Sequence, residues 1–153
     1  MKTQPYFEDI RVGEEIPHQV REPLSTRGLV KWAAAVRDFY EVHYDKDFAR
    51  SIGLRDVIAH GPNKCALLGR LMTEWIGEAG RLHRLSCTHK ASNFPGETLV
   101  CRGRVKDKYS KDGRHYVECE VWVENQDGVV AAPGAATVSL PSRGVEPLPS
   151  ARP

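Results

Sequence analysis

The chain has 153 residues, a formal net charge of +2 and a hydrophobic share of 41%. This length suits one domain with one core, and the apolar share is ordinary for a globular protein. Acidic and basic residues are interspersed, so the charge gives no argument for binding nucleic acid or a membrane. The polar N-terminus lacks the apolar core of a signal peptide, and no long apolar stretch follows. We therefore expect a cytoplasmic protein.

The first helix is predicted over residues 29–36, with Ser25 or Thr26 as its N-cap. The residues that follow show no helical face, so this helix should end near Asp38. Asp38 and His43 lie five positions apart, and on a continuous helix they would point about 140° apart. The two side chains can meet at one site only if the chain leaves the helix between them. We therefore predict a turn that carries His43.

Residues 62–77 form the strongest helix prediction. Their apolar side chains recur at spacings of three and four, which predicts a helix buried along most of its length. Lys64, Arg70 and Glu74 mark the side expected to be less buried, and Gly77 and Gly80 should end the helix. The apolar stripe consists of Cys65, Leu67, Leu68, Leu71, Met72, Trp75 and Ile76.

Gly61 and Pro62 stand at the start of this helix. Proline is favoured in the first turn because its missing N–H costs nothing there, and glycine lets a ligand approach the backbone closely. A helix N-terminus also carries unpaired N–H groups and a partial positive charge, which suits a developing oxyanion. The pair is consistent either with an oxyanion site or with an ordinary helix start.

The second half of the chain predicts an antiparallel meander after a short first strand and the helix. The pairs Asp112-Gly113 and Asp127-Gly128 are strong hairpin signals, and Pro133-Gly134 indicates a bulge or an edge in the last strand. One buried helix with such a meander is an α+β layout. The strand candidates are residues 82–90, 99–106, 117–124 and 129–140.

The positions of the cysteines argue against a metal site. The four cysteines form no CxxC pair, so the sequence indicates no zinc site. Cys65 falls on the predicted helix, and Cys87, Cys101 and Cys119 fall in strand candidates, as small buried residues do.

The tail over residues 141–153 is rich in Pro, Ser and Arg, and we expect it to be disordered.

The segment 37–61 resembles the hydratase motif of the MaoC-like (R)-specific enoyl-CoA hydratases and dehydratases. The segments 6–14 and 94–99 also resemble that family, so the resemblance covers roughly residues 6 to 140. The residues that match in order and spacing are Asp38, His43, Asp45, Ala49, Gly53, His60 and Gly61.

The resemblance implies a hot-dog fold over residues 1–140, in which an antiparallel sheet wraps around a long central helix. It implies a hydratase or dehydratase that acts on an acyl-CoA or acyl carrier protein thioester without a cofactor or metal. Asp38 and His43 would activate water, and the Gly61 amide would polarise the thioester carbonyl. His60 and Tyr40 are candidates for substrate binding, although a structural hydrogen bond is the favoured role of His60.

The resemblance also leaves alternatives open. Tyr40 and Glu41 stand where the family usually has Asn-Pro, and Gly69 stands where it often has Ser. The pattern from Arg37 to Asp45, with Asp38, Phe39 and His43, and the run Thr73-Glu74-Trp75 also resemble the small hot-dog subunit of steroid side-chain enoyl-CoA hydratases. That subunit works beside a different partner chain. The present chain could therefore be a homodimer, a subunit of a heteromeric hydratase or an acyl-binding subunit. A hot-dog thioesterase is a further alternative, for which Glu74 is the only acid well inside the helix.

Overall fold

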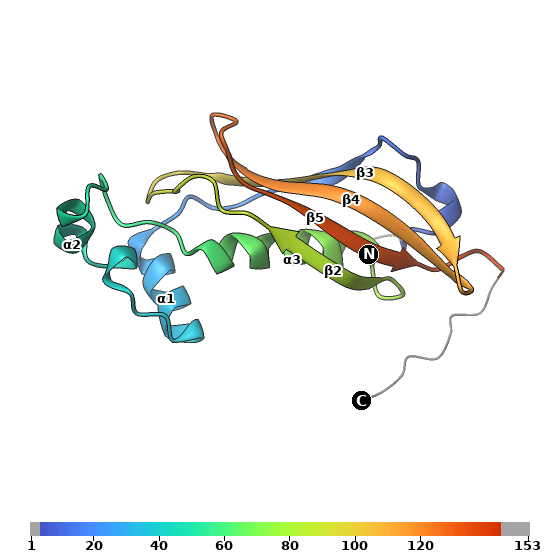
Figure 1. The fold of residues 1–153 in the computed structure, drawn as a ribbon, viewed down its shortest axis with the longest axis horizontal. Coiled ribbons are helices and arrows are strands. Elements are labelled where there is room, and N and C mark those ends of the chain that lie inside the picture. The colour runs from blue at the N-terminus through green and yellow to red at the C-terminus, as the bar shows by residue number, and fades with distance from the viewer. Residues whose placement is uncertain (1–3, 145–153) are drawn as a thin grey trace.

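The structure is a computed structural model that describes residues 4–144 (Figure 1). Five strands, three α-helices and two short 3-10 helices make up this part of the chain. In chain order they are η1 (Phe7–Asp9), β1 (Glu15–Val20), α1 (Thr26–Val36), η2 (Glu41–His43), α2 (Lys46–Ser51), α3 (Gly61–Ile76), β2 (Arg81–Cys87), β3 (Leu99–Lys111), β4 (Arg114–Asn125) and β5 (Val130–Leu140).

The strands form one antiparallel sheet in the order β1-β3-β4-β5-β2, and α3 runs along one face of it (Figure 1). Alternate residues of β3, β4 and β5 point towards α3, because successive side chains of a strand point to opposite faces. Leu68, Leu71 and Met72 of α3 meet them in the main core. The predicted hot-dog fold is confirmed, including both hairpin turns, where Asp112, Gly113 and Gly128 have positive φ angles.

The first helix forms as its sequence predicts. The side chain of Ser25 caps α1 by accepting a hydrogen bond from the N–H of Gly28 (3.1 Å). Arg37 then adopts the left-handed conformation, with φ 58° and ψ 32°, which ends the helix. The helix therefore ends just before Asp38, near the predicted position, and His43 follows in η2, so no continuous helix joins the two residues.

Lys64 does not lie on a less buried side of α3, so that prediction was wrong. Its relative exposure is 2%, and its ammonium donates a hydrogen bond to the carbonyl oxygen of Ala91 (2.7 Å). The connection between β2 and β3 covers the first turn of the helix, which helical periodicity cannot reveal. Burial lowers the pKa of Lys64. Arg70 does remain exposed on α3.

The prediction of a bulge or edge at Pro133-Gly134 was also wrong. β5 lies between β4 and β2, and it continues through both residues. The pairing with β4 shifts instead between Val123 and Glu124, opposite Ala132 and Val130. Gly134 is required by close packing, because a Cβ there would lie 2.3 Å from the carbonyl oxygen of Ser86 in β2.

α1, η2 and α2 lie beyond one end of the sheet and form an overhang over residues 26–53 (Figure 1). A small second core holds the overhang to the segment that enters α3, and it contains Leu29, Ala49, Val57 and Ala59. These contacts bring the region around Asp38 to the N-terminus of α3.

No helix within residues 4–144 is long and apolar enough to cross a membrane.

Only the beginning of the predicted tail is described. The carbonyl oxygen of Pro141 accepts a hydrogen bond from the N–H of Phe7 (2.9 Å), and the Arg143 guanidinium pairs with Asp9 (2.5 Å). Pro141 and Arg143 therefore contact η1. The prediction of disorder for 145–153 falls outside the described residues, and the assignment of residues 1–140 to one domain stays a prediction.

Candidate active site

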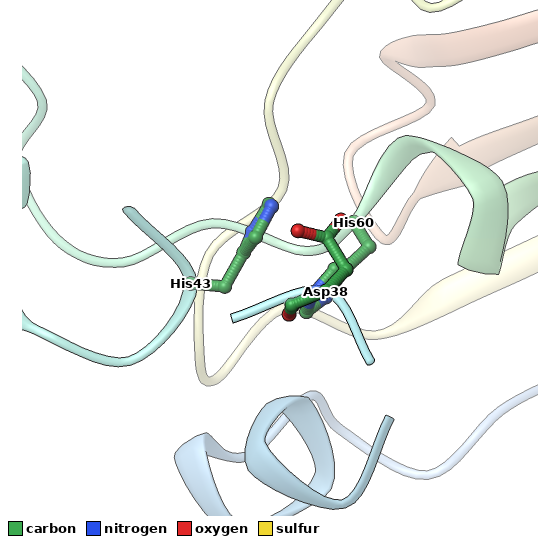
Figure 2. Close-up of side chains that lie close together, drawn as sticks. All are labelled: Asp38, His43 and His60. Carbon is green, nitrogen blue, oxygen red and sulfur yellow. The ribbon is translucent and has the colours of Figure 1, made fainter. Parts of the chain in front are cut away.

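Three predicted site residues come together at the junction of the overhang and α3. Asp38 follows α1, His43 ends η2, and His60 immediately precedes α3. One ligating atom from each side chain lies within 4.8 Å of the other two. Figure 2 shows the three side chains converging from their separate segments. The turn after α1 thus brings residues that are far apart on a helical wheel to one point.

The end of α1 fixes the position of Asp38. Its N–H donates a hydrogen bond to the carbonyl oxygen of Ala33 (3.0 Å) after the left-handed turn at Arg37. One carboxylate oxygen accepts a long hydrogen bond from the N–H of Tyr40 (3.3 Å). The side chain is therefore held by local backbone, while the carboxylate keeps further lone pairs for a ligand.

A backbone hydrogen bond determines the tautomer of His43. Nδ1 lies 2.8 Å from the carbonyl oxygen of Ile58, and a carbonyl oxygen can only accept, so Nδ1 carries a proton. In the neutral imidazole, Nε2 then has the free lone pair. The N–H of Ile58 donates in return to the carbonyl oxygen of Val42 (3.1 Å), which ties η2 to the segment before α3. Nε2 is thus oriented to accept a proton, as a general base must.

His60 is completely buried and stacks against His43, with ring centroids 3.5 Å apart and an angle of 20° between the planes. Its Nε2 lies 3.3 Å from the backbone carbonyl oxygen of Asp38, which makes Nε2 the protonated nitrogen. Nδ1 has no hydrogen-bond partner within residues 4–144. Burial lowers the pKa of His60, so the ring is neutral at neutral pH.

The other two predicted site residues lie at the margins of this cluster. Gly61 is the first residue of α3, where N–H groups have no partner within the helix, and its backbone is partly exposed. Tyr40 is 53% exposed, and the edge of its ring contacts His43 and Phe48, with centroid distances of 6.3 and 5.5 Å. Tyr40 therefore forms part of the wall at the exposed side of the cluster.

Asp38, His43 and His60 have the composition of a site that binds iron or zinc. The stacking of the rings opposes that use. A metal must lie close to the plane of each imidazole, about 2.0–2.1 Å from its nitrogen. The two ring planes are nearly parallel and their centroids are 3.5 Å apart, so one ion cannot lie near both planes. This arrangement suits a proton-transfer site better than a metal centre.

Sequence reasoning missed one segment of the site, the connection between β2 and β3. The carbonyl oxygen of Asn93 accepts a hydrogen bond from the N–H of Ala59 (2.9 Å), just before His60. The Asn93 side chain is itself buried, and its amide donates to Glu97 (3.0 Å). The only available signal was the group of small and polar residues that follows β2, and such a group usually marks a plain loop.

A sequence profile of the MaoC-like domain matches residues 8–126, which is most of the chain. The chain belongs to the MaoC-like domain family. The match includes the overhang, all of α3 and four of the five strands.

Three proteins illustrate what this chain is similar to. The beta subunit of the 3-oxo-4,17-pregnadiene-20-carboxyl-CoA hydratase of Mycobacterium tuberculosis is 27% identical over 77 residues, which is 50% of this chain and 60% of that subunit. An R-hydratase from Pseudomonas aeruginosa has a similar structure, with a TM-score of 0.79 and 22% identity over 97% of this chain and 96% of its own. A MaoC-like dehydratase from Rhodospirillum rubrum gives a TM-score of 0.80 and 21% identity over 92% and 99%.

Burial of His60 should make the stability of the fold depend on pH. Because its pKa is lowered in the folded state, the unfolded chain binds a proton at His60 as the pH falls below about 6.5, while the folded chain resists it. Stability should therefore decline as the pH falls through that region. We predict a smaller decline for His60→Gln, whose amide can still reach the Asp38 carbonyl. Urea unfolding at a series of pH values measures this, and parallel declines in both proteins would contradict it.

Proposed function

We propose that this protein is an enoyl-thioester hydratase, which adds water across the C2–C3 double bond of an acyl-CoA and also catalyses the reverse dehydration. The observation that carries the proposal is the convergence of Asp38 and His43 beside the N-terminus of α3. A base with a free, oriented lone pair lies there with a carboxylate and a helix end that favours negative charge. Membership of the MaoC-like family and the hydratases among its similar proteins support this proposal.

In the proposed mechanism, a water molecule binds between the Asp38 carboxylate and Nε2 of His43. Nε2 accepts a proton as the water oxygen attacks C3. The hydrogen bond from Nδ1 to the Ile58 carbonyl holds the ring in place and stabilises the imidazolium that forms. The proton then returns to C2, either from His43 or through Asp38. The same two groups serve the dehydration in the reverse order.

Negative charge develops on the thioester oxygen when C3 is attacked. The N–H of Gly61 at the first position of α3 would donate a hydrogen bond to that oxygen, and the partial positive charge of the helix end adds to the stabilisation. Loss of one such donor typically costs about a hundredfold or more in rate. No metal is required, because the thioester itself polarises the double bond.

His60 would support this machinery rather than exchange protons. It is buried and neutral, it stacks on the ring of His43, and it binds the backbone of Asp38. These contacts set the distance between the base and the carboxylate. Tyr40 has the exposure and the position to contact the acyl chain of the substrate at the entrance.

We propose that a second hot-dog subunit packs on the overhang, and that it is another copy of this chain. Large apolar side chains are exposed there: Val36 by 45%, Phe39 by 56% and Ile52 by 51%. Contiguous apolar surface marks contact sites for other proteins, and these three side chains all come from the overhang. Within residues 4–144, β1 and β2 are the edge strands of the sheet, and the outer side of one of them can pair with a second sheet.

A heteromeric hydratase is the second candidate. The similarity to the beta subunit of the mycobacterial hydratase favours it, as does the occurrence of Tyr40 and Glu41 at positions where the family usually has Asn-Pro. In that arrangement a different hot-dog chain would take the place of the second copy. The thioesterase alternative has less support, because Glu74 binds Arg70 (2.6 Å) and Gln19 (2.8 Å) near the far end of α3.

Replacement of the two proposed catalytic side chains should abolish most of the hydration. We predict that Asp38→Asn and His43→Ala each lower the rate about a hundredfold to ten-thousandfold, the usual contribution of general acid–base groups. The loss of the conjugated enoyl thioester absorbance band measures the rate, with crotonyl-CoA and a bulkier enoyl-CoA as substrates. Circular dichroism checks that the variants are folded. Near-normal rates in folded variants would contradict the assignment.

The subunit proposal predicts that the purified chain is a dimer by light scattering after size-exclusion chromatography. Phe39→Asp should shift it towards a monomer, because a charge would be buried at the contact. Val12→Asp is the matched control, since Val12 is also exposed (58%) but lies before β1, outside the overhang. A wild-type monomer that hydrates no enoyl-CoA would favour the heteromeric candidate instead.

A further inference from the structure

We propose that His89 is a further catalytic residue, which donates a second hydrogen bond to the thioester oxygen beside the N–H of Gly61. This inference rests on the hydratase function proposed above. It assigns a role to a residue on the connection between β2 and β3, outside the cluster formed by Asp38, His43 and His60.

The first observation is the contact between His89 and the backbone of Gly61. A Cβ placed on Gly61 would lie 2.7 Å from both Cδ2 and Nε2 of His89 and 3.1 Å from its Cγ. These distances are too short for a real Cβ, so the imidazole occupies the space that a side chain at position 61 would need. Nε2 therefore lies beside the Cα of the residue whose N–H would bind the thioester oxygen.

The second observation is that the backbone on both sides of His89 is fixed. The N–H of Thr88 donates to the carbonyl oxygen of Pro133, and the N–H of Lys90 donates to that of Ala131, both at 2.9 Å. Ala91, two residues after His89, is held as well: its carbonyl oxygen accepts a hydrogen bond from the buried ammonium of Lys64 in the first turn of α3. The backbone that carries His89 is thus held at the helix end before any ligand arrives, and a fixed position of the donor favours stabilisation of a transition state.

The third observation is that the nitrogens of His89 are available. The side chain is exposed, and within residues 4–144 its ring has no hydrogen-bond partner. The other two histidines near the site differ, because His43 donates to Ile58 and His60 donates to Asp38. An imidazole carries at least one N–H in either protonation state, so His89 can donate to an oxygen without giving up a structural contact.

The chemistry of the reaction gives this donor a use. Two donors that share one oxygen at about 2.7–3.1 Å each must lie within roughly 6 Å of each other. The contact of Nε2 with the Gly61 backbone satisfies that condition. The oxygen gains negative charge only as water attacks C3, so the bond from His89 strengthens in the transition state. Its loss should therefore lower kcat more than it raises KM.

The test compares His89→Phe, which keeps a flat ring without an N–H, with His89→Gln, which keeps a side-chain N–H donor. We expect His89→Phe to lower kcat for crotonyl-CoA hydration by roughly tenfold to a hundredfold with little change in KM. His89→Gln should restore part of that loss. Thermal unfolding of both variants checks that the fold is unchanged.

A spectroscopic readout separates polarisation of the carbonyl from mere support of the fold. The absorption band of dimethylaminocinnamoyl-CoA moves to longer wavelength when its thioester carbonyl is polarised. The shift on binding should be large in the wild type, smaller in His89→Phe and intermediate in His89→Gln. Asp38→Asn is the control, because it should keep the shift while it loses hydration.

The outcomes distinguish the two levels of the proposal. A wild-type band shift and kcat in His89→Phe would overturn the role of His89 and leave the hydratase function standing. Equal losses in His89→Phe and His89→Gln would also overturn it, since they would show that the shape of the ring matters and its N–H does not. A wild-type protein that neither hydrates enoyl-CoA nor shifts the band would overturn the proposed function, and this inference with it.

Discussion

The hydrogen bond from Nδ1 of His43 to the carbonyl oxygen of Ile58 is the interaction on which the site depends. It fixes the tautomer of the histidine, directs Nε2 to the cluster, and ties the overhang to the segment that enters α3. Two residues further on, His60 stacks on the same ring, and Gly61 begins the helix. The base, its neutral support and the helix end are therefore positioned by a single short stretch of backbone.

The electrostatics of this junction follow from burial. His60 is neutral because burial lowers its pKa, so it places no positive charge beside the ring of His43. Lys64 is buried as well, in the first turn of α3, where a cation opposes the helix dipole. Its ammonium is compensated by the carbonyl oxygen of Ala91. This hydrogen bond holds the connection between β2 and β3 over that end of the helix.

Local signals in the sequence predicted much of the fold. Ser25, the loss of periodicity after Val36 and the Asp-Gly turns act through the nearest few residues, so they could be interpreted without knowledge of the tertiary structure. The burial of Lys64 and the continuity of β5 through Pro133 and Gly134 depend on segments far along the chain, and these predictions were wrong. The conformational requirement at Asp38 and His43 came from helix geometry, while their proposed roles came from family resemblance. Neither kind of reasoning indicated the stacking of His60 or the contact of His89 with Gly61, because both need positions in space.

The central claim is that the junction of the overhang and α3 adds water to a carbon–carbon double bond. Incubation of the purified protein with enoyl-CoA substrates in water enriched in heavy oxygen tests it most directly. Mass spectrometry then identifies the products. We predict an intact 3-hydroxyacyl-CoA with the heavy oxygen at C3, and no such product from Asp38→Asn. Unchanged enoyl-CoA, or a free acid with the heavy oxygen in its carboxylate, would contradict it.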